Sequence, residues 1–267
     1  MTQIISIHSY RGGTGKSNLV ANLATNLVLQ GKRVAIFDAD IQSPGIHLLF
    51  GLDDEQIKYT LNDYLWGQCP LAETAYDVSN FINKELGKQV VESKSIYLVP
   101  SSMKPEEIAT VLSEGYDVEL LHQGFKELSN LLALDYLFVD THPGLSEETL
   151  LAIGISDVTV VILRPDCQDY QGTAVVLDVA RQLEVSRMLL VANKVLPEVN
   201  ADALGTKIEN IYQVPVAGVL PISNDMFRLA SQGIFCLRHP NSSFTQEINK
   251  ISQKIGEILP QTVELSR

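Results

Sequence analysis

A glycine-rich segment near the start of the chain most constrains the fold. Residues 11–17 read Arg-Gly-Gly-Thr-Gly-Lys-Ser, between an apolar run at 4–7 and a helical pattern at 16–30. A strand, a glycine-rich turn and a helix in this order form a phosphate-binding loop, in which successive backbone N–H groups and the helix N-terminus face one anion. The segment therefore predicts these three elements in direct succession, with an anion site between them.

Apolar runs bounded by turn residues recur along the rest of the chain. They cover 4–7, 34–37, 96–99, 136–139, 158–163, 188–191 and 214–220, and helical patterns cover 16–30, 104–112, 118–132, 147–153, 170–183 and 203–212. Continuous rather than alternating hydrophobicity is typical of strands buried on both faces, hence of a parallel sheet. The alternation predicts a doubly wound α/β fold, with a mainly parallel sheet and helices on both faces.

Residues 41–93 are less regular, with short helical pieces at 45–50 and 60–66. We interpret this stretch as an elaborated crossover rather than a second domain, and we expect residues 1–267 to form one domain.

Composition bounds the compartment and the partners. The chain has three cysteines and no C-x-x-C pair, which argues against a disulfide framework and a thiolate metal site. No apolar run in the sequence approaches the ~20 residues that are needed to span a bilayer. We expect an unexported, soluble, cytoplasmic protein. The formal charge of −12 opposes binding to nucleic acid or an anionic membrane at long range, although a local patch could still bind.

Several polar residues follow predicted strands, where a parallel sheet binds its ligand. Lys16 is a cation for the β- and γ-phosphates, and Ser17 offers the hydroxyl that Mg²⁺ needs. Asp38 and Asp40 leave the second strand pointing the same way, and Asp140 ends another strand, where a carboxylate can hold a water on Mg²⁺. These residues predict a site for a magnesium nucleotide.

The loop resembles that of the ParA/MinD family of dimerising ATPases, whose form is K-G-G-x-G-K-[ST]. The ordinary P-loop pattern has glycine where this chain has Tyr10, and the family has its signature lysine where this chain has Arg11. The resemblance implies a SIMIBI-like P-loop NTPase fold, with ATP and Mg²⁺ as cofactors. Carboxysome-positioning members of the family are also described as lacking the signature lysine.

The resemblance also implies roles for individual residues. The family's catalytic positions correspond to Lys16, Asp40, Arg11 and Asp38. Its nucleotide contacts correspond to Arg11, Gly12, Gly13, Thr14, Gly15, Lys16, Ser17, Asn18, Asn193 and Pro221. Its magnesium site corresponds to Ser17, Asp140 and Asp40. In the family, Asp40 would orient the attacking water, Asn193 would read the adenine edge, and the signature lysine would act on the nucleotide of the partner subunit.

Three assignments stay open at this point. Either Arg11 takes the lysine's role in trans or a distant lysine does, with Lys104 as a candidate that is better explained as a solvated residue at a helix start. His142, in D-T-H-P-G, tunes the switch or merely packs. The segment 164–172 is a dimer contact near the nucleotide or, equally, an N-cap cluster for the next helix.

From the resemblance we expect a homodimer around two ATP molecules that hydrolyses them slowly and switches its affinity for a surface and an adaptor protein. Non-specific DNA, with nucleoid association, is favoured slightly over a membrane. The basic candidates for DNA are Arg228, Arg238, His239, Lys250 and Lys254. The apolar face of the helical pattern at 244–259 suits packing on the sheet better than membrane binding.

Other functional classes are a scaffold that binds ATP with little hydrolysis, a metal-centre maturation factor, and a small-molecule kinase or synthetase. The maturation factors that resemble this chain commonly carry a cysteine pair, which Cys69, Cys167 and Cys236 do not form.

Overall fold

The computed structural model describes residues 2–87, 95–185 and 187–257. Within them lies an eight-stranded sheet of order β3-β4-β2-β5-β1-β6-β7-β8. The strands are β1 Gln3–His8, β2 Val34–Ala39, β3 Tyr76–Asp77, β4 Ile96–Val99, β5 Tyr136–Thr141, β6 Val158–Leu163, β7 Met188–Val195 and β8 Val216–Pro221. Described neighbours pair in parallel except β3, which pairs antiparallel with β4. The predicted doubly wound α/β fold is confirmed.

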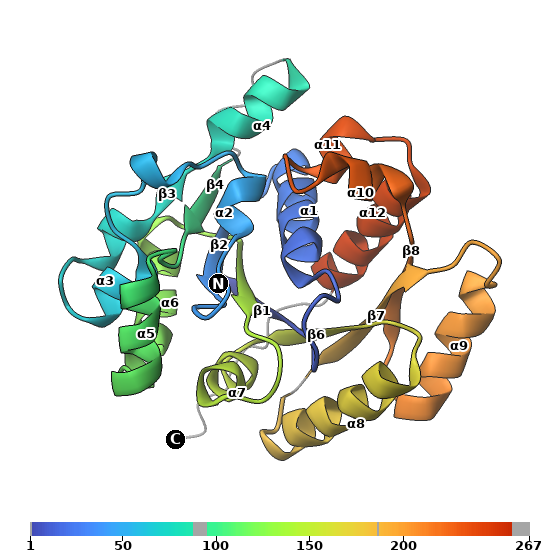
Figure 1. Cartoon of the computed structure of the whole chain (residues 1–267). Helices are drawn as coiled ribbons and strands as arrows, with labels where there is room; N and C mark the ends of the chain where they lie inside the picture. The colour runs from blue at the N-terminus through green and yellow to red at the C-terminus, as the bar shows by residue number, and fades with distance from the viewer. Residues whose placement is uncertain (1, 88–94, 186, 258–267) are drawn as a thin grey trace.

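Helices cover both faces of this sheet (Figure 1). They are α1 Lys16–Leu29, α2 Ile46–Leu49, α3 Leu61–Leu65, α4 Ser79–Leu86, α5 Pro105–Glu114, α6 Val118–Leu131, α7 Glu147–Gly154, α8 Cys167–Gln182, α9 Ala201–Tyr212, α10 Asn224–Leu229, α11 Phe235–Arg238 and α12 Ser243–Gly256. One buried cluster joins α1, α2, α4, α11 and α12 to the first face. On the other face, α3, α5, α6 and α7 cover β2, β4 and β5, while α8 and α9 cover β6, β7 and β8.

Alternation along each strand divides the core between the two faces. In β2, Ile36 belongs to the cluster under α1, whereas Ala35 and Phe37 belong to the cluster under α6. All six residues of β2 are buried, which is why the sequence shows a continuous apolar run rather than an alternating one.

The predicted boundaries need small corrections. Helix α8 begins at Cys167 rather than Tyr170, because the side chain of Asp166 accepts hydrogen bonds from the N–H groups of Gln168 and Asp169 and caps the helix. The segment 164–172 therefore does contain a capped helix start. Strand β8 begins at Val216, after Pro215, and the two-residue strand β3 was missed because so short a pair leaves no periodic signal.

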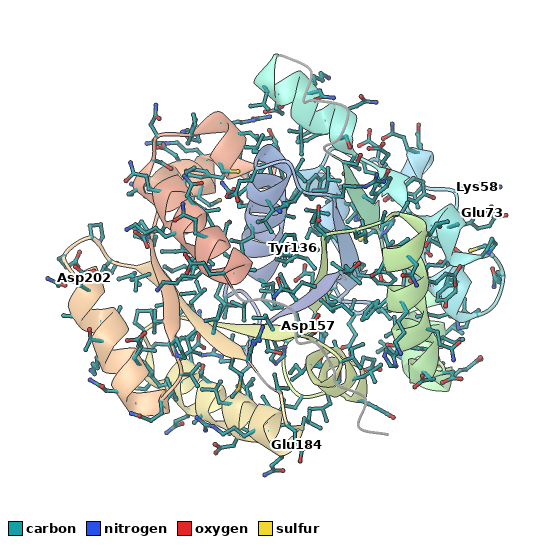
Figure 2. The ribbon with its side chains drawn as sticks, turned by 180° about the vertical axis from the view of Figure 1, so that it is seen from behind. Lys58, Glu73, Tyr136, Asp157, Glu184 and Asp202 are labelled. Carbon is teal, nitrogen blue, oxygen red and sulfur yellow. The ribbon has the colours of Figure 1, made fainter. Side chains whose placement is uncertain are left out.

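Residues 41–87 contain α2, α3, β3 and α4, with two 3₁₀ turns at Asp54–Gln56 and Leu71–Thr74, while residues 88–93 of the predicted crossover lie outside the described residues. Charged side chains such as Asp202, Glu184 and the Lys58–Glu73 pair lie at the outline of the molecule in Figure 2, and Tyr136, at the start of β5, lies near the middle of that view.

Candidate nucleotide site

The predicted site residues gather at one edge of the sheet. The loop follows β1, Asp40 follows β2, and Asp140 and Asn193 lie near the ends of β5 and β7. Strands β2 and β5 are neighbours, with Asp38 directly opposite Asp140. The carboxyl ends of parallel strands thus bring together groups that lie about a hundred positions apart in the sequence.

The loop has the backbone conformation that its glycines predict. Gly13 and Gly15 have φ values of +74° and +99°, where residues that carry a Cβ atom are strained. A Cβ at Gly15 would also lie 2.6 Å from Nδ2 of Asn193. Glycine is therefore required at position 15 by both conformation and space, and Lys16 next to it is largely buried at the start of α1.

Two side chains near the end of β7 donate hydrogen bonds to carbonyl groups of the loop. Nδ2 of Asn193 donates to the carbonyl of Thr14 at 2.7 Å, and Nζ of Lys194 donates to the carbonyl of Gly13 at 2.7 Å. Sequence reasoning missed Lys194, although its place beside Asn193 at the end of an apolar strand was a signal. That Asn193 reads adenine stays a prediction.

Three carboxylates are buried behind the loop. Asp38 accepts from the N–H groups of Asp40 and Gly45, each at 3.2 Å, yet burial and the charges of Asp140 and Asp40 raise its pKa well above the usual range. Burial also raises the pKa of Asp140 to about 6, against the opposing effects of Lys16 and a hydrogen bond with Ser17. Bringing these carboxylates together out of water is costly without a cation.

The site fits Mg²⁺. Oδ1 of Asp140 is fully buried without a hydrogen-bond partner, and Ser17 already lies against the same carboxyl group. Hard oxygen donors of this kind, beside a phosphate cradle, are what Mg²⁺ prefers. Ser17 and Asp140 are therefore the residues that would hold the ion, with Asp40 close by.

Two histidines adjoin the carboxylates. Nδ1 of His142 lies 2.7 Å from Oδ1 of Asp40, so His142 does more than pack. His8 is fully buried at the end of β1, and burial, followed by the charges of Lys16 and His142, lowers its pKa to about 3. Since the Thr141 hydroxyl donates to the carbonyl of Ile7, it accepts from Nδ1 of His8, which leaves Nε2 of His8 as a buried lone pair without a partner.

Arg11 pairs within its own chain. Its Nη1 lies 3.6 Å from Oδ1 of Asp169 and 3.9 Å from Oδ1 of Asp166, and the side chain is 40% exposed. Asp169 also binds Arg164 through two guanidinium nitrogens. The ring of Tyr10, beside Arg11, lies against Gly172 of α8. The entrance of the loop, formed by Tyr10 and Arg11, is thus held against the N-terminal part of α8.

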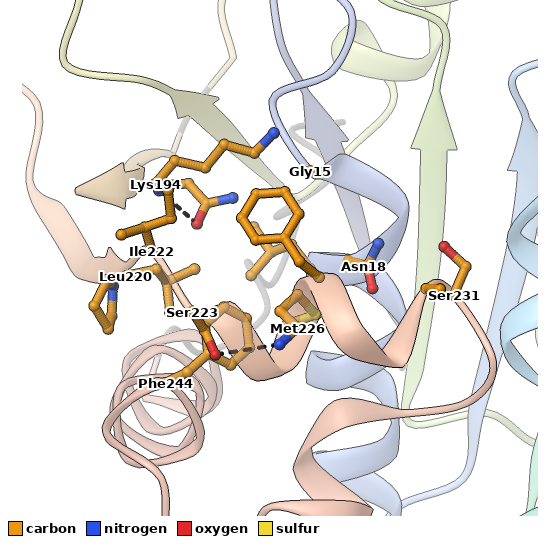
Figure 3. A pocket seen from close by; sticks show the side chains of 14 residues that line it. Gly15, Asn18, Lys194, Leu220, Ile222, Ser223, Met226, Ser231 and Phe244 are labelled. Atoms are coloured by element: carbon orange, nitrogen blue, oxygen red, sulfur yellow. Dashed lines mark hydrogen bonds between the residues drawn. The ribbon is translucent and has the colours of Figure 1, made fainter. Parts of the chain in front are cut away.

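A pocket of about 230 Å³ opens beside the loop (Figure 3). Its lining includes Gly15, Asn18, Asn193, Lys194, Pro221, Ile222, Ser223, Met226, Phe227 and Phe244. Helix α10, which carries Met226, lies across from Gly15 and Lys194, and Ser223 caps this helix by accepting from the N–H of Met226 at 3.2 Å. Most of the lining residues are apolar, and the pocket adjoins the phosphate-binding loop at Gly15. Both properties are expected of a site for a nucleotide base.

The other sequence candidates are a lysine and three cysteines. Lys104 precedes α5, is solvent-exposed and binds Glu107 at 2.8 Å, as expected of a residue at a helix start. Cys69, Cys167 and Cys236 are free; Cys167 is exposed, whereas Cys236 is buried in the core with its pKa raised to about 12 by burial. Among described residues no group of three or more His, Cys, Asp or Glu could hold a metal ion.

Helix α12 packs on the sheet as predicted for its described part. Phe244, Ile248, Ile251 and Ile255 are buried, and Ile251 lies over Gly218 of β8. Residues 258–259 of the predicted pattern lie outside the described residues. None of the described helices is both long enough and apolar enough to span a membrane.

The basic candidates for DNA binding mostly have partners. Arg228 binds Asp225, Arg238 binds Glu85 and Lys250 binds Glu247. Nζ of Lys254 donates to the carbonyl of Val216. The acidic partners offset much of the positive charge of this group.

Comparison with known proteins identifies the family of the chain. The model of the family ParA, described as NUBPL iron-transfer P-loop NTPase, matches residues 1–256. The chain belongs to the ParA family of P-loop NTPases. Among curated relatives, the uncharacterized ATP-binding protein MJ0547 of Methanocaldococcus jannaschii is 28% identical, over 96% of this chain and 88% of that protein. The septum site-determining protein MinD of Bacillus subtilis is 22% identical, over 98% and 92%.

Solved structures of MinD proteins share the fold. MinD of Pyrococcus horikoshii complexed with Mg-ADP has a TM-score of 0.77 at 22% identity, covering 97% of both chains. MinD of Aquifex aeolicus in a MinC:MinD complex has a TM-score of 0.74 at 19% identity, covering 100% of this chain and 99% of that one.

Proposed function

We propose that this ParA-family protein is a Mg²⁺-dependent ATPase that dimerises around ATP, hydrolyses it slowly and thereby switches its affinity for a surface and an adaptor protein. One observation carries the ATPase assignment: Lys16, the Ser17–Asp140 pair and Asp40 converge at one sheet edge, beneath a glycine loop whose conformation suits phosphate. The Mg-ADP in the Pyrococcus horikoshii MinD structure supports the choice of ligand.

The chemistry is positioning and electrostatics. The loop amides and Lys16 hold the phosphates, and the pocket that contains Asn18, Asn193 and Pro221 takes the base. Asp40 orients the attacking water. When bound, Mg²⁺ would neutralise charge on the transferred phosphoryl group, with Ser17 and Asp140 as its protein ligands.

Arg11 is the proposed contact with the partner subunit's nucleotide. Its guanidinium is 40% exposed at the loop entrance and is held by Asp169 and Asp166 at more than 3.5 Å, so little needs to break before it can reach outward. An arginine supplied in trans is an effective stabiliser of phosphoryl-transfer charge.

The proposal also includes a surface and an adaptor protein. The MinC:MinD complex is a precedent for a protein partner in a structural relative. Non-specific DNA, with the protein in the cytoplasm at the nucleoid, is our proposed surface. Burial of the apolar face of α12 counts against membrane binding by its described part, and ion pairing of the basic group predicts weak, salt-sensitive DNA binding.

A second candidate is a scaffold that binds ATP but barely hydrolyses it. The cis pairing of Arg11 with Asp169 favours it, because a guanidinium that stays on its own chain cannot stabilise charge on a partner's nucleotide. The retained carboxylates Asp40 and Asp140 count against it.

Phosphate release and light-scattering chromatography test both candidates. For an ATPase switch, wild type releases phosphate from ATP faster than Lys16→Ala, Asp40→Ala accumulates an ATP-dependent dimer, and Arg11→Ala loses that dimer. A wild-type rate equal to that of Lys16→Ala, with ATP binding intact, would leave the scaffold. DNA binding by the Asp40→Ala dimer at several salt concentrations tests the surface, and no binding at low salt refutes DNA.

A further inference from the structure

His142 makes a direct hydrogen bond to the carboxylate that the proposed mechanism uses to orient water. Its Nδ1 lies 2.7 Å from Oδ1 of Asp40. An ionised carboxylate only accepts, so the imidazole donates through Nδ1 and its Nε2 faces away from this bond. The side chains are 22% and 11% exposed, so water screens this bond only in part.

Sheet topology makes this contact. In the β2–β5 pairing, Ala39 lies opposite Thr141. The next residues along the two parallel strands are Asp40 and His142, which therefore leave the sheet side by side.

The backbone of His142 is held independently of its side chain. Its carbonyl accepts from Oγ1 of the buried Thr149 at 3.2 Å, and two residues on the N–H of Gly144 donates to the carbonyl of Ser9 at 3.1 Å. Pro143 between them has a fixed φ. A change confined to the imidazole therefore leaves the path of this segment in place.

Both side-chain hydrogen bonds of Asp40 among the described residues fall on the same oxygen. Oδ1 accepts from Nδ1 of His142 and from the N–H of Ser43 at 3.1 Å. With Oδ1 held at two points, the carboxylate plane is set, and Oδ2 remains to accept a hydrogen bond from water.

We propose that His142 is a positioning residue for ATP hydrolysis: it fixes Oδ1 of Asp40, so that Oδ2 of Asp40 orients the attacking water. This inference rests on the proposed ATPase function and extends it to a histidine that acts through Asp40. Ser43 alone holds the carboxylate loosely, because it contributes one hydrogen bond from a turn after β2.

The test compares His142→Ala with His142→Asn, whose Nδ2 can donate from nearly the position of Nδ1. We expect His142→Ala to lower kcat about ten- to hundredfold with KM and ATP affinity within about twofold of wild type. His142→Asn should recover kcat to within about threefold of wild type. His122→Ala, which removes a histidine paired with Glu119 on α6, is the matched control and should keep wild-type kcat.

A double-mutant cycle asks whether His142 acts through Asp40. In an Asp40→Asn background, His142→Ala should change the residual kcat less than about twofold, because the carboxylate it positions is gone. Thermal unfolding of each variant, with and without ADP, identifies loss of fold.

Four results overturn the proposal. They are wild-type kcat in His142→Ala, equal loss in the Ala and Asn variants, a parallel loss of ATP affinity and kcat, and a full additional loss in the Asp40→Asn background. A wild type that turns over no faster than Lys16→Ala overturns the ATPase function and this inference together, whereas the first four leave the ATPase function standing.

Discussion

Gly172 on α8 should not tolerate alanine as long as Tyr10 is present. A Cβ at position 172 would lie 2.2 Å from Cδ1, 2.4 Å from Cγ and 2.7 Å from Cβ of Tyr10, where ordinary contacts begin at 3.4 Å. The ring can rotate into solvent, but rotation leaves the Cβ atom of Tyr10 in place. The backbone at the loop entrance therefore has to move, in addition to the ring.

The expected cost follows from two opposing effects. Overpacking of this kind destabilises by about 1–3 kcal/mol, while alanine in a helix interior is favoured over glycine by about 0.8–1 kcal/mol. In wild type the clash outweighs the helix preference, and Gly172→Ala should destabilise by about 1 kcal/mol. In a Tyr10→Gly background the clash is gone, and Gly172→Ala should stabilise by up to about 1 kcal/mol. The sign of the effect reverses, with a coupling energy of about 2 kcal/mol.

Urea unfolding of wild type, both single variants and the double variant measures this coupling. Gly205→Ala on α9 is the control, since its Cβ would meet nothing closer than 3.6 Å. ATP affinity is a second readout, because displacement of the loop entrance should weaken phosphate binding in Gly172→Ala and not in Gly205→Ala. If both alanines have the same effect on stability in the wild-type background, the reasoning about close approach is refuted.

Three further predictions concern the site and the core. Burial raises the pKa of Asp140 to about 6 in the folded protein, so the stabilisation that comes from protonating this group is fully present below about pH 4 and is lost as pH rises through 6. Asp140→Asn removes the titrating group and, without metal, should reduce the change in the free energy of unfolding over this pH range by about 3 kcal/mol. Parallel curves of unfolding free energy for wild type and variant from pH 4 to 7.5 would contradict this prediction. Phe125→Ala should cost about 3–5 kcal/mol in urea unfolding, since Phe125 is fully buried with its ring centroid 4.7 Å from that of Phe37; a loss below about 1 kcal/mol would show that the site collapses. Ser242→Ala removes the cap of α12 and should cost about 1 kcal/mol in the same assay, with Ser242→Asn as the nearly neutral comparison.

Local pattern was enough for the fold class and for much of the candidate site. Strands buried on both faces read as continuous apolar runs, and the glycine loop lies between β1 and α1 as its spacing predicts. Lys16, Asp40 and Asp140 share one edge because each lies near the carboxyl end of a strand or at the start of the helix after it, which is a local property. Their roles with ATP stay predictions.

Contacts across the sheet were beyond reach of the sequence. Nothing local says that β2 lies beside β5, yet that order decides that Asp40 meets His142, 102 positions away. Nor does any spacing indicate that Tyr10 lies on Gly172, or that Arg11 lies beside Asp169.

The division has a physical reason. The period of apolar residues, the glycines at positive φ and the helix caps record interactions within a few residues. The amino-acid sequence by itself therefore determined most of the long elements and the end of the sheet where ligands bind, whereas the short elements β3, α4, α10 and α11 were not predicted. Which strands become neighbours depends on how all the apolar faces pack at once, a choice among long-range arrangements with similar local preferences. Only the tertiary structure therefore decided that His142 holds Asp40 and that the loop entrance rests on α8.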